Sequence, residues 1–128
     1  MTDIQAVQTT NESFYRAFEK KNLEAMETVW SHGVGTLCIH PGRSALKGWP
    51  DIRDSWQQIF ANTQYLEIDV DIVSTEVQGA IAYIVVVEKV MQVLRGRRFE
   101  ARSMATNIFE KMGDRWYLTH HHGSPIGS

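Results

Sequence analysis

Residues 65–72 read Tyr-Leu-Glu-Ile-Asp-Val-Asp-Ile, and this stretch decides how the second half of the chain folds. Apolar and acidic side chains alternate in it with a period of two, which is typical of a β-strand with one buried face and one face in water. The next apolar segment, residues 80–94, differs because side chains of both parities are apolar up to Val87. Such a strand belongs at the centre of a sheet whose two faces are both covered.

Glycine-containing turns divide the rest of this half into long strands. The predicted strands are residues 65–76, 80–94, 98–111 and 116–123, separated by Gly79, Gly96 and Gly113-Asp114. Because short turns join long strands, we expect an antiparallel meander.

The first half of the chain has helical periodicity instead. We expect helices over about residues 3–20, 22–31 and 50–60, with a short strand at residues 36–39 before Pro41-Gly42. Three helices of this size cover one face of the sheet. The most economical cover for the other face is a second copy of the sheet, so the sequence predicts a homodimer through the outer sheet face.

Composition narrows the class of protein. The 128 residues fit a single domain, residues 1–128, and 43% of them are hydrophobic. The net charge of −2 provides no basic surface for nucleic acid, and the longest apolar run, Ala80 to Val87, is too short to cross a membrane. Cys38 is the single cysteine, and residues 1–5 lack the features of a signal peptide, so we expect a cytoplasmic protein.

Four motifs add a family resemblance to this order of elements. They are Phe18-Glu-Lys-Lys-Asn-Leu-Glu-Ala-Met26, Leu46-Lys-Gly-Trp-Pro-Asp-Ile-Arg-Asp-Ser-Trp56, Trp116-Tyr-Leu-Thr-His-His-His-Gly-Ser-Pro125 and Ile39-His-Pro-Gly42. Together they resemble the NTF2-like, or cystatin-like, superfamily in its SnoaL-like and ketosteroid isomerase-related branch. The resemblance implies an α+β cone, in which three N-terminal helices pack on a bent antiparallel sheet around a pocket. It implies no single reaction, because the superfamily includes isomerases, cyclases, dehydratases, hydrolases and association domains.

Three consecutive histidines lie in the last predicted strand. Strand alternation places His120 and His122 on one face with Trp116 and Leu118, and His121 on the other. Because Trp116 and Leu118 suit a core, we expect His120 and His122 on the concave side. They are hydrogen-bonded histidines of the core or dimer seam, or a pocket acid and base, since imidazole titrates near neutral pH.

His40 ends the short strand beside Pro41-Gly42, where it holds the strand end or lines the mouth of the pocket. With His120 and His122 it could also supply a zinc or iron site. We favour no metal, because the sequence near these histidines contains no acidic partner for them. No cofactor-binding motif is present, so we expect no cofactor.

Aromatic and charged side chains complete the set of candidate site residues. Trp30, Trp49, Trp56 and Tyr83 fill the core or line an apolar ligand pocket. Glu88 lies in an apolar strand, where a buried carboxylate needs a partner, and Arg102 in the next strand is a sensible one. Without full pairing, burial would raise the pKa of Glu88 and make it a proton-transfer group.

We therefore expect a protein that binds a small, largely apolar molecule in an aromatic cone. The enzyme classes that fit such a pocket are isomerase, cyclase and dehydratase, with His122, His120 or Glu88 for proton transfer. The alternative is a non-catalytic association module of the kinase-association type. Polar residues converging inside the cone would favour the first function.

Overall fold

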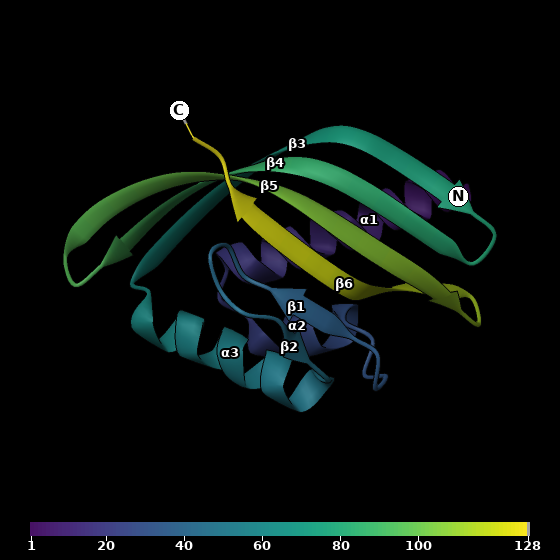
Figure 1. The fold of residues 1–128 in the computed structure, drawn as a ribbon, viewed down its shortest axis with the longest axis horizontal. Helices are drawn as coiled ribbons and strands as arrows, with labels where there is room; N and C mark the ends of the chain where they lie inside the picture. The colour runs from purple at the N-terminus through teal and green to yellow at the C-terminus, as the bar shows by residue number, and fades with distance from the viewer. Residues whose placement is uncertain (128) are drawn as a thin grey trace.

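The computed structural model describes residues 1–127, which form three helices and one six-stranded sheet (Figure 1). In chain order the elements are α1 (Asp3–Glu19), α2 (Leu23–Val29), β1 (Leu37–Ile39), β2 (Leu46–Lys47), α3 (Trp49–Asn62), β3 (Tyr65–Gln78), β4 (Ile81–Leu94), β5 (Arg97–Met112) and β6 (Arg115–Pro125). The expected three helices and four-stranded meander are confirmed. The two-residue strand β2 was not expected from the sequence.

Local sequence sets the helix boundaries. Thr2 and Gln5 form a capping box at the start of α1, in which each side chain bonds the backbone of the other. The Asn22 side chain accepts from Ala25 N at the start of α2. Gly48 precedes α3 with a φ of 88°, a conformation that favours glycine, and Pro50 occupies the first turn.

The sheet has the strand order β2-β1-β6-β5-β4-β3. Strands β3 to β6 are antiparallel neighbours, whereas β1 pairs in parallel with β6, with Leu37 opposite His120. Gly123 of β6 passes so close to Pro41 that a Cβ there would lie 2.9 Å from Pro41 Cγ. The chain therefore needs glycine where the end of β6 passes the β1 loop.

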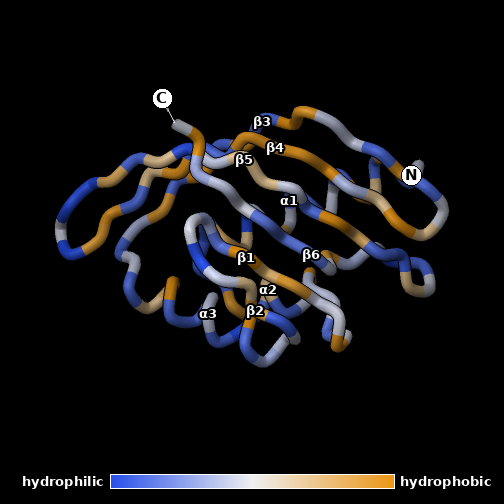
Figure 2. Tube along the Cα trace, in the orientation of Figure 1, coloured by the Kyte–Doolittle hydropathy of each residue, from blue (hydrophilic) through white to orange (hydrophobic). Residues whose placement is uncertain are grey.

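The bent sheet arches over the helices, which lie on its concave side (Figure 1). The core between them contains Phe14 and Tyr15 from α1, Trp56 from α3, Ile84 from β4 and Phe109 from β5. Figure 2 shows the hydrophobic middle of β4 and the hydrophilic tip of the β4–β5 hairpin. Among residues 1–127, no helix is long and apolar enough to span a membrane.

A β-bulge changes the direction of the side chains in β6. The register shifts between Ile108 and Phe109, which lie opposite His120 and Leu118, so Thr119 is the extra residue. After this bulge His121, rather than its two neighbours, shares the concave face with Leu118. The prediction that His120 and His122 face the cone is wrong, because simple alternation from Trp116 does not hold across a bulge.

Candidate functional site

Glu88 of β4 is the charged centre of the cone interior. It lies on the concave face, in line with Ile84 and Val86, and its exposed fraction is only 3%. The phenol of Tyr15, on α1, donates a 2.6 Å hydrogen bond to Glu88 Oε2. Burial raises the pKa of Glu88 to about 7, although the hydrogen bond from Tyr15 acts in the opposite direction. Glu88 therefore exchanges its proton near neutral pH.

Asn107 of β5 connects Tyr15 to the buried histidine. Its amide nitrogen donates to Asn11 Oδ1 at 2.9 Å and to the Tyr15 hydroxyl at 3.0 Å. Its amide oxygen lies 2.6 Å from His121 Nδ1 and accepts from it. The network thus assigns the proton of neutral His121 to Nδ1 and leaves a lone pair on Nε2.

His121 and Glu88 form a buried pair of titratable side chains. His121 Nε2 lies 4.0 Å from Glu88 Oε2, and the two side chains are almost completely buried. Burial lowers the pKa of His121 to about 3. The charges of His40, His120 and His122 act in the same direction but contribute less. The pair is therefore not an ion pair at neutral pH. It joins a neutral nitrogen base to a carboxyl group that can hold or release a proton.

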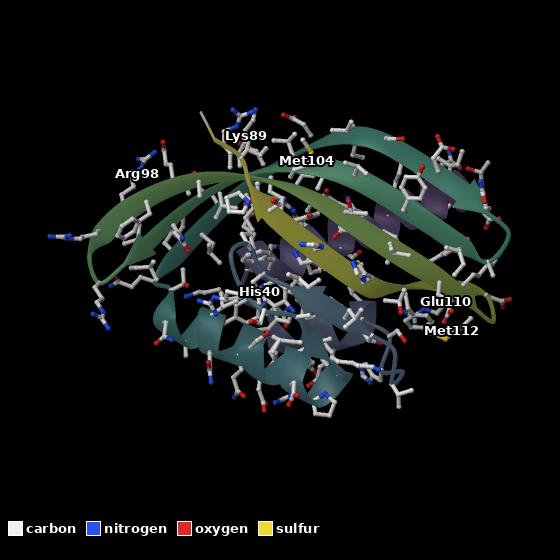
Figure 3. The ribbon with its side chains drawn as sticks, in the orientation of Figure 1. His40, Lys89, Arg98, Met104, Glu110 and Met112 are labelled. Carbon is white, nitrogen blue, oxygen red and sulfur yellow. The ribbon has the colours of Figure 1, made fainter. Side chains whose placement is uncertain are left out.

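His40 lies in a second buried polar group beside the first. Its Nε2 is 3.0 Å from Ser55 Oγ, which donates its own proton to Ile52 O at 2.7 Å. His40 Nε2 must therefore donate to Ser55 Oγ. Burial, assisted by the charge of Arg43, lowers the pKa of His40 to about 4, so this imidazole is also neutral. Figure 3 shows His40 between the sheet and α3.

The tryptophans predicted to fill the core or line the pocket lie in different surroundings. Trp56 is completely buried, and its ring lies 4.8 Å from that of His40 and 6.4 Å from that of His121, measured between centroids. Trp30 is also buried and donates to Met26 Sδ at 3.2 Å. Trp49 stacks on His32 with a centroid distance of 4.8 Å. Trp56 is thus the tryptophan whose ring contacts both site histidines.

Two candidate residues lie on the outer face of the sheet instead. Tyr83 is 41% exposed and does not line the cone. Arg102 lies opposite Lys89, whereas Glu88 lies opposite Ser103, so the expected Glu88–Arg102 pair does not form. The two side chains are on opposite faces of the sheet because their strands pair with this register. Tyr15, rather than Arg102, is the partner of Glu88.

The three histidines that the sequence left open as a metal site are also divided between the two faces. His120 and His122 lie on the outer face, with ring centroids 6.3 Å apart, while His40 is buried. Within residues 1–127, no three His, Cys, Asp or Glu side chains are placed to hold a metal ion. The structure thus does not bring together the metal ligands that the sequence left open.

Three members of the polar network were missed in the sequence. Asn11, Tyr15 and Asn107 carry no motif, but each interrupts an apolar pattern with a polar atom that a core position must satisfy. A polar side chain at a core position in a strand, as at Asn107, is the signal that could have identified them.

The exposure of the concave face changes along the row of side chains that contains Glu88. In the β4–β5 register Glu88 faces Ser103, Val90 faces Ala101 and Gln92 faces Phe99. Side-chain exposure increases along this row, from buried Ser103 to exposed Ala101 and to Phe99, which is 45% exposed. The concave row that contains Glu88 is therefore most exposed at the β4–β5 hairpin, and Ser103 and Ala101 in this row have small side chains.

Comparison with known proteins agrees with this architecture. Residues 7–127 match the family model described as a SnoaL-like domain. The chain belongs to the SnoaL-like family. This SnoaL-like domain is 28% identical over 120 residues to the F-box protein SKIP8 of Arabidopsis thaliana. The match covers 94% of the chain but 49% of SKIP8, so the chain spans about half the length of that curated relative.

Two solved structures resemble the SnoaL-like chain in fold, and their sequence identities to it are similar. One is a candidate dehydratase of the NTF2-like family from Streptomyces avermitilis, with 27% identity, a TM-score of 0.90 and 98% of each chain covered. The other is a candidate calcium/calmodulin-dependent protein kinase type II association domain from Thiobacillus denitrificans, with 26% identity, a TM-score of 0.84 and 94% of each chain covered. The NTF2-like α+β fold expected from the sequence is confirmed.

Proposed function

We propose that this SnoaL-like protein binds a small, largely apolar molecule in its cone and transfers a proton with Glu88, beside which the neutral His121 lies. The observation that carries the proposal is the buried Glu88–His121 pair, oriented by Tyr15 and Asn107. A buried carboxylate without a charged partner destabilises a fold, so the presence of Glu88 on the concave sheet face favours a functional role. His121 takes the place that the sequence suggested for His120 and His122.

The reaction class that fits these groups is dehydration or isomerisation next to a carbonyl. Ionised Glu88 would remove a proton from the carbon beside the carbonyl, and the C–H electron pair would form the new double bond. In a dehydration the C–O bond of a β-hydroxyl group breaks, and protonated Glu88 gives its proton to the leaving hydroxide, which departs as water. In an isomerisation the same proton returns to another carbon. Neither route requires a cofactor.

The comparison with the Streptomyces avermitilis structure supports this class of reaction. That protein is described as a candidate dehydratase, and the likeness extends over 98% of both chains. The SnoaL-like chain has a buried carboxyl group that titrates near neutral pH, which is the group that such an elimination uses.

An assay of conjugated-ketone formation tests the proposal. A panel of β-hydroxy ketones and β,γ-unsaturated ketones is suitable, because both classes give an α,β-unsaturated product with strong ultraviolet absorbance. We expect Glu88→Gln to lower turnover at least ~100-fold. The matched control is Glu76→Gln, on the exposed side of β3, which should leave turnover unchanged. Equal turnover by Glu88→Gln and the unaltered protein would contradict the proposal.

A second function, an association module, is favoured by the outer face of the sheet. Tyr83 and Met104 are 41% and 39% exposed there, Val85 and Val87 follow Tyr83 on the same face of β4, and Val87 lies opposite Met104. Figure 3 shows Met104 pointing away from the helices. The Thiobacillus denitrificans structure, described as a kinase association domain, supports this alternative. We propose that the face forms a homodimer, which is compatible with either function.

We also propose a reducing, cytoplasmic location, without nucleic acid or membrane as a partner. Cys38 is the single cysteine of the sequence and is buried beside His40, where it is not available for disulfide formation. Fractionation of cells producing the tagged chain would check this location.

A further inference from the structure

The indole N–H of Trp56 has no hydrogen-bond acceptor among residues 1–127, although it is shielded from water. A buried donor without an acceptor is rare in folded proteins because it loses its bond to water and gains nothing in return. The indole groups of Trp30 and Trp116 show the usual arrangement, since they donate to Met26 Sδ and Asp3 Oδ1. The unpaired indole N–H of Trp56 therefore needs a separate explanation.

The position of Trp56 relates this donor to the site. Its ring packs against His40 and His121, and against Phe14, whose ring in turn lies 4.8 Å from that of Tyr15. No acceptor of these residues receives the Trp56 N–H: Ser55 Oγ accepts from His40, Asn107 Oδ1 accepts from His121, and the lone pair of His121 Nε2 has no hydrogen bond to Trp56. The free donor thus lies beside the acid–base network without taking part in it.

The charge of the interior limits which kind of ligand can supply a hydrogen-bond acceptor for the Trp56 N–H. Within residues 1–127, Glu88 is the one completely buried side chain of the Asp, Glu, Lys and Arg types. An anionic ligand would meet this carboxylate without a buried Lys or Arg to balance its charge. A cationic ligand would pair with Glu88 but would bring no acceptor for the Trp56 N–H. An uncharged oxygen acceptor satisfies both groups.

We propose that the Trp56 indole N–H donates a hydrogen bond to the carbonyl oxygen of an uncharged ligand bound beside Glu88. This inference rests on the proposed function and names its substrate class. When Glu88 removes the proton next to the carbonyl, negative charge develops on that oxygen. A neutral donor held rigidly by aromatic packing stabilises this charge more than it stabilises the ground state.

Binding of matched probes tests the inference. The probes are 1-indanone, which carries a carbonyl oxygen, indane, which lacks it, the cation 1-aminoindane and the anion indane-1-carboxylate. We expect the unaltered protein to bind 1-indanone at least tenfold more tightly than the other three. Tighter binding of either charged probe, or equal binding of indane, would overturn the inference.

The variant Trp56→Phe removes the N–H and keeps most of the apolar contact. We expect it to bind 1-indanone and indane with equal affinity, whereas the control Trp116→Phe should keep the preference for 1-indanone. A preference that survives in Trp56→Phe would show that another group is the donor. If Trp56→Phe does not fold, the indole ¹H–¹⁵N signals of the unaltered protein give a second test. A buried indole signal must then shift downfield with 1-indanone and not with indane, and no such shift would overturn the inference.

The two proposals fail in different ways. If Glu88→Gln loses turnover while Trp56→Phe keeps the carbonyl preference, the proposed function stands and the role of Trp56 is wrong. If Trp56→Phe loses the preference while Glu88→Gln retains full turnover, Trp56 binds the carbonyl but the acid–base function of Glu88 is wrong.

Discussion

The protonation of Glu88 couples the site to the stability of the fold. Burial raises the pKa of Glu88 from an ordinary 4.5 to about 7, so the unfolded chain loses this proton at a lower pH than the folded protein does. Below about pH 4.5 both states hold the proton, and Glu88 has no effect. As the pH rises from 4.5 to 7 the folded state loses relative stability, and above pH 7 the loss is complete.

We therefore expect Glu88→Gln to raise the free energy of unfolding above pH 7, by up to about 3 kcal/mol, because glutamine is neutral and still accepts from Tyr15. The gain should vanish near pH 4. His40 and His121 have lowered pKa values and destabilise the fold as the pH falls, but they do so equally in both proteins. Urea denaturation of both proteins from pH 4 to 9 measures the difference. A constant difference across this range would contradict the expected pKa.

Trp56 is the second residue whose replacement gives a clear expectation. It is completely buried and contacts aromatic rings from α1, α3 and β6. Trp56→Ala should cost ~3–5 kcal/mol of stability through the cavity that it leaves. Thermal melts of Trp56→Ala and Trp56→Phe, compared with the unaltered protein, check this. A melting temperature unchanged by Trp56→Ala would show that the Trp56 side chain of α3 is not packed in the core.

At the scale of elements, the sequence predicted those parts of the fold that have local signals. The turns at Gly79, Gly96 and Gly113 divide the meander correctly, and Thr2 and Asn22 begin helices where expected. The parallel pairing of β1 with β6 has no local signal, because it joins distant parts of the chain.

The candidate site was less predictable than the fold for the same reason. The positions of Glu88 and Trp56 inside the cone follow from local periodicity, and these residues do lie in the interior. The direction of His121 depends on a bulge opposite Ile108, and the partner of Glu88 comes from α1 rather than from the adjacent strand. Cross-strand register and helix docking decide both, and neither can be derived from residue spacing alone.

The β4–β5 turn provides a prediction for a single element. Arg95 and Gly96 have positive φ values of 52° and 77°, as the two central residues of a type I′ hairpin turn do. Arginine is strained in this conformation, whereas asparagine tolerates it. Arg95→Asn should therefore stabilise the protein by up to ~1 kcal/mol. Thermal melts of this variant and of the control Arg97→Asn, a strand position, measure the gain. A lower melting temperature for Arg95→Asn would contradict it.

At the scale of the whole molecule, the proposed homodimer gives the clearest prediction. An interface of standard size buries ~1,600 Å² in total, and the apolar centre of the outer face supplies its core. We expect a dimer at micromolar concentration in analytical ultracentrifugation. Val85→Asp, at the centre of this face, should give a folded monomer because it would bury an unpaired charge.

The control for this experiment is Val34→Asp, at a position that is 90% exposed in the connection between α2 and β1. It should remain dimeric. A monomer in the unaltered protein, or a dimer in Val85→Asp, would exclude the outer face as the interface.

The pairing of β1 with β6 also affects the order of folding. Leu37 can pair with His120 only after the last strand has formed. The hydrogen bond between Asn11 and Asn107 joins residues that are 96 positions apart. Contacts between such distant residues slow the folding of a chain, because a long loop must close before they form. During synthesis on a ribosome, α1 would emerge long before the strands that its Tyr15 and Asn11 contact. The acid–base network is therefore assembled late, and a partly made chain cannot contain it.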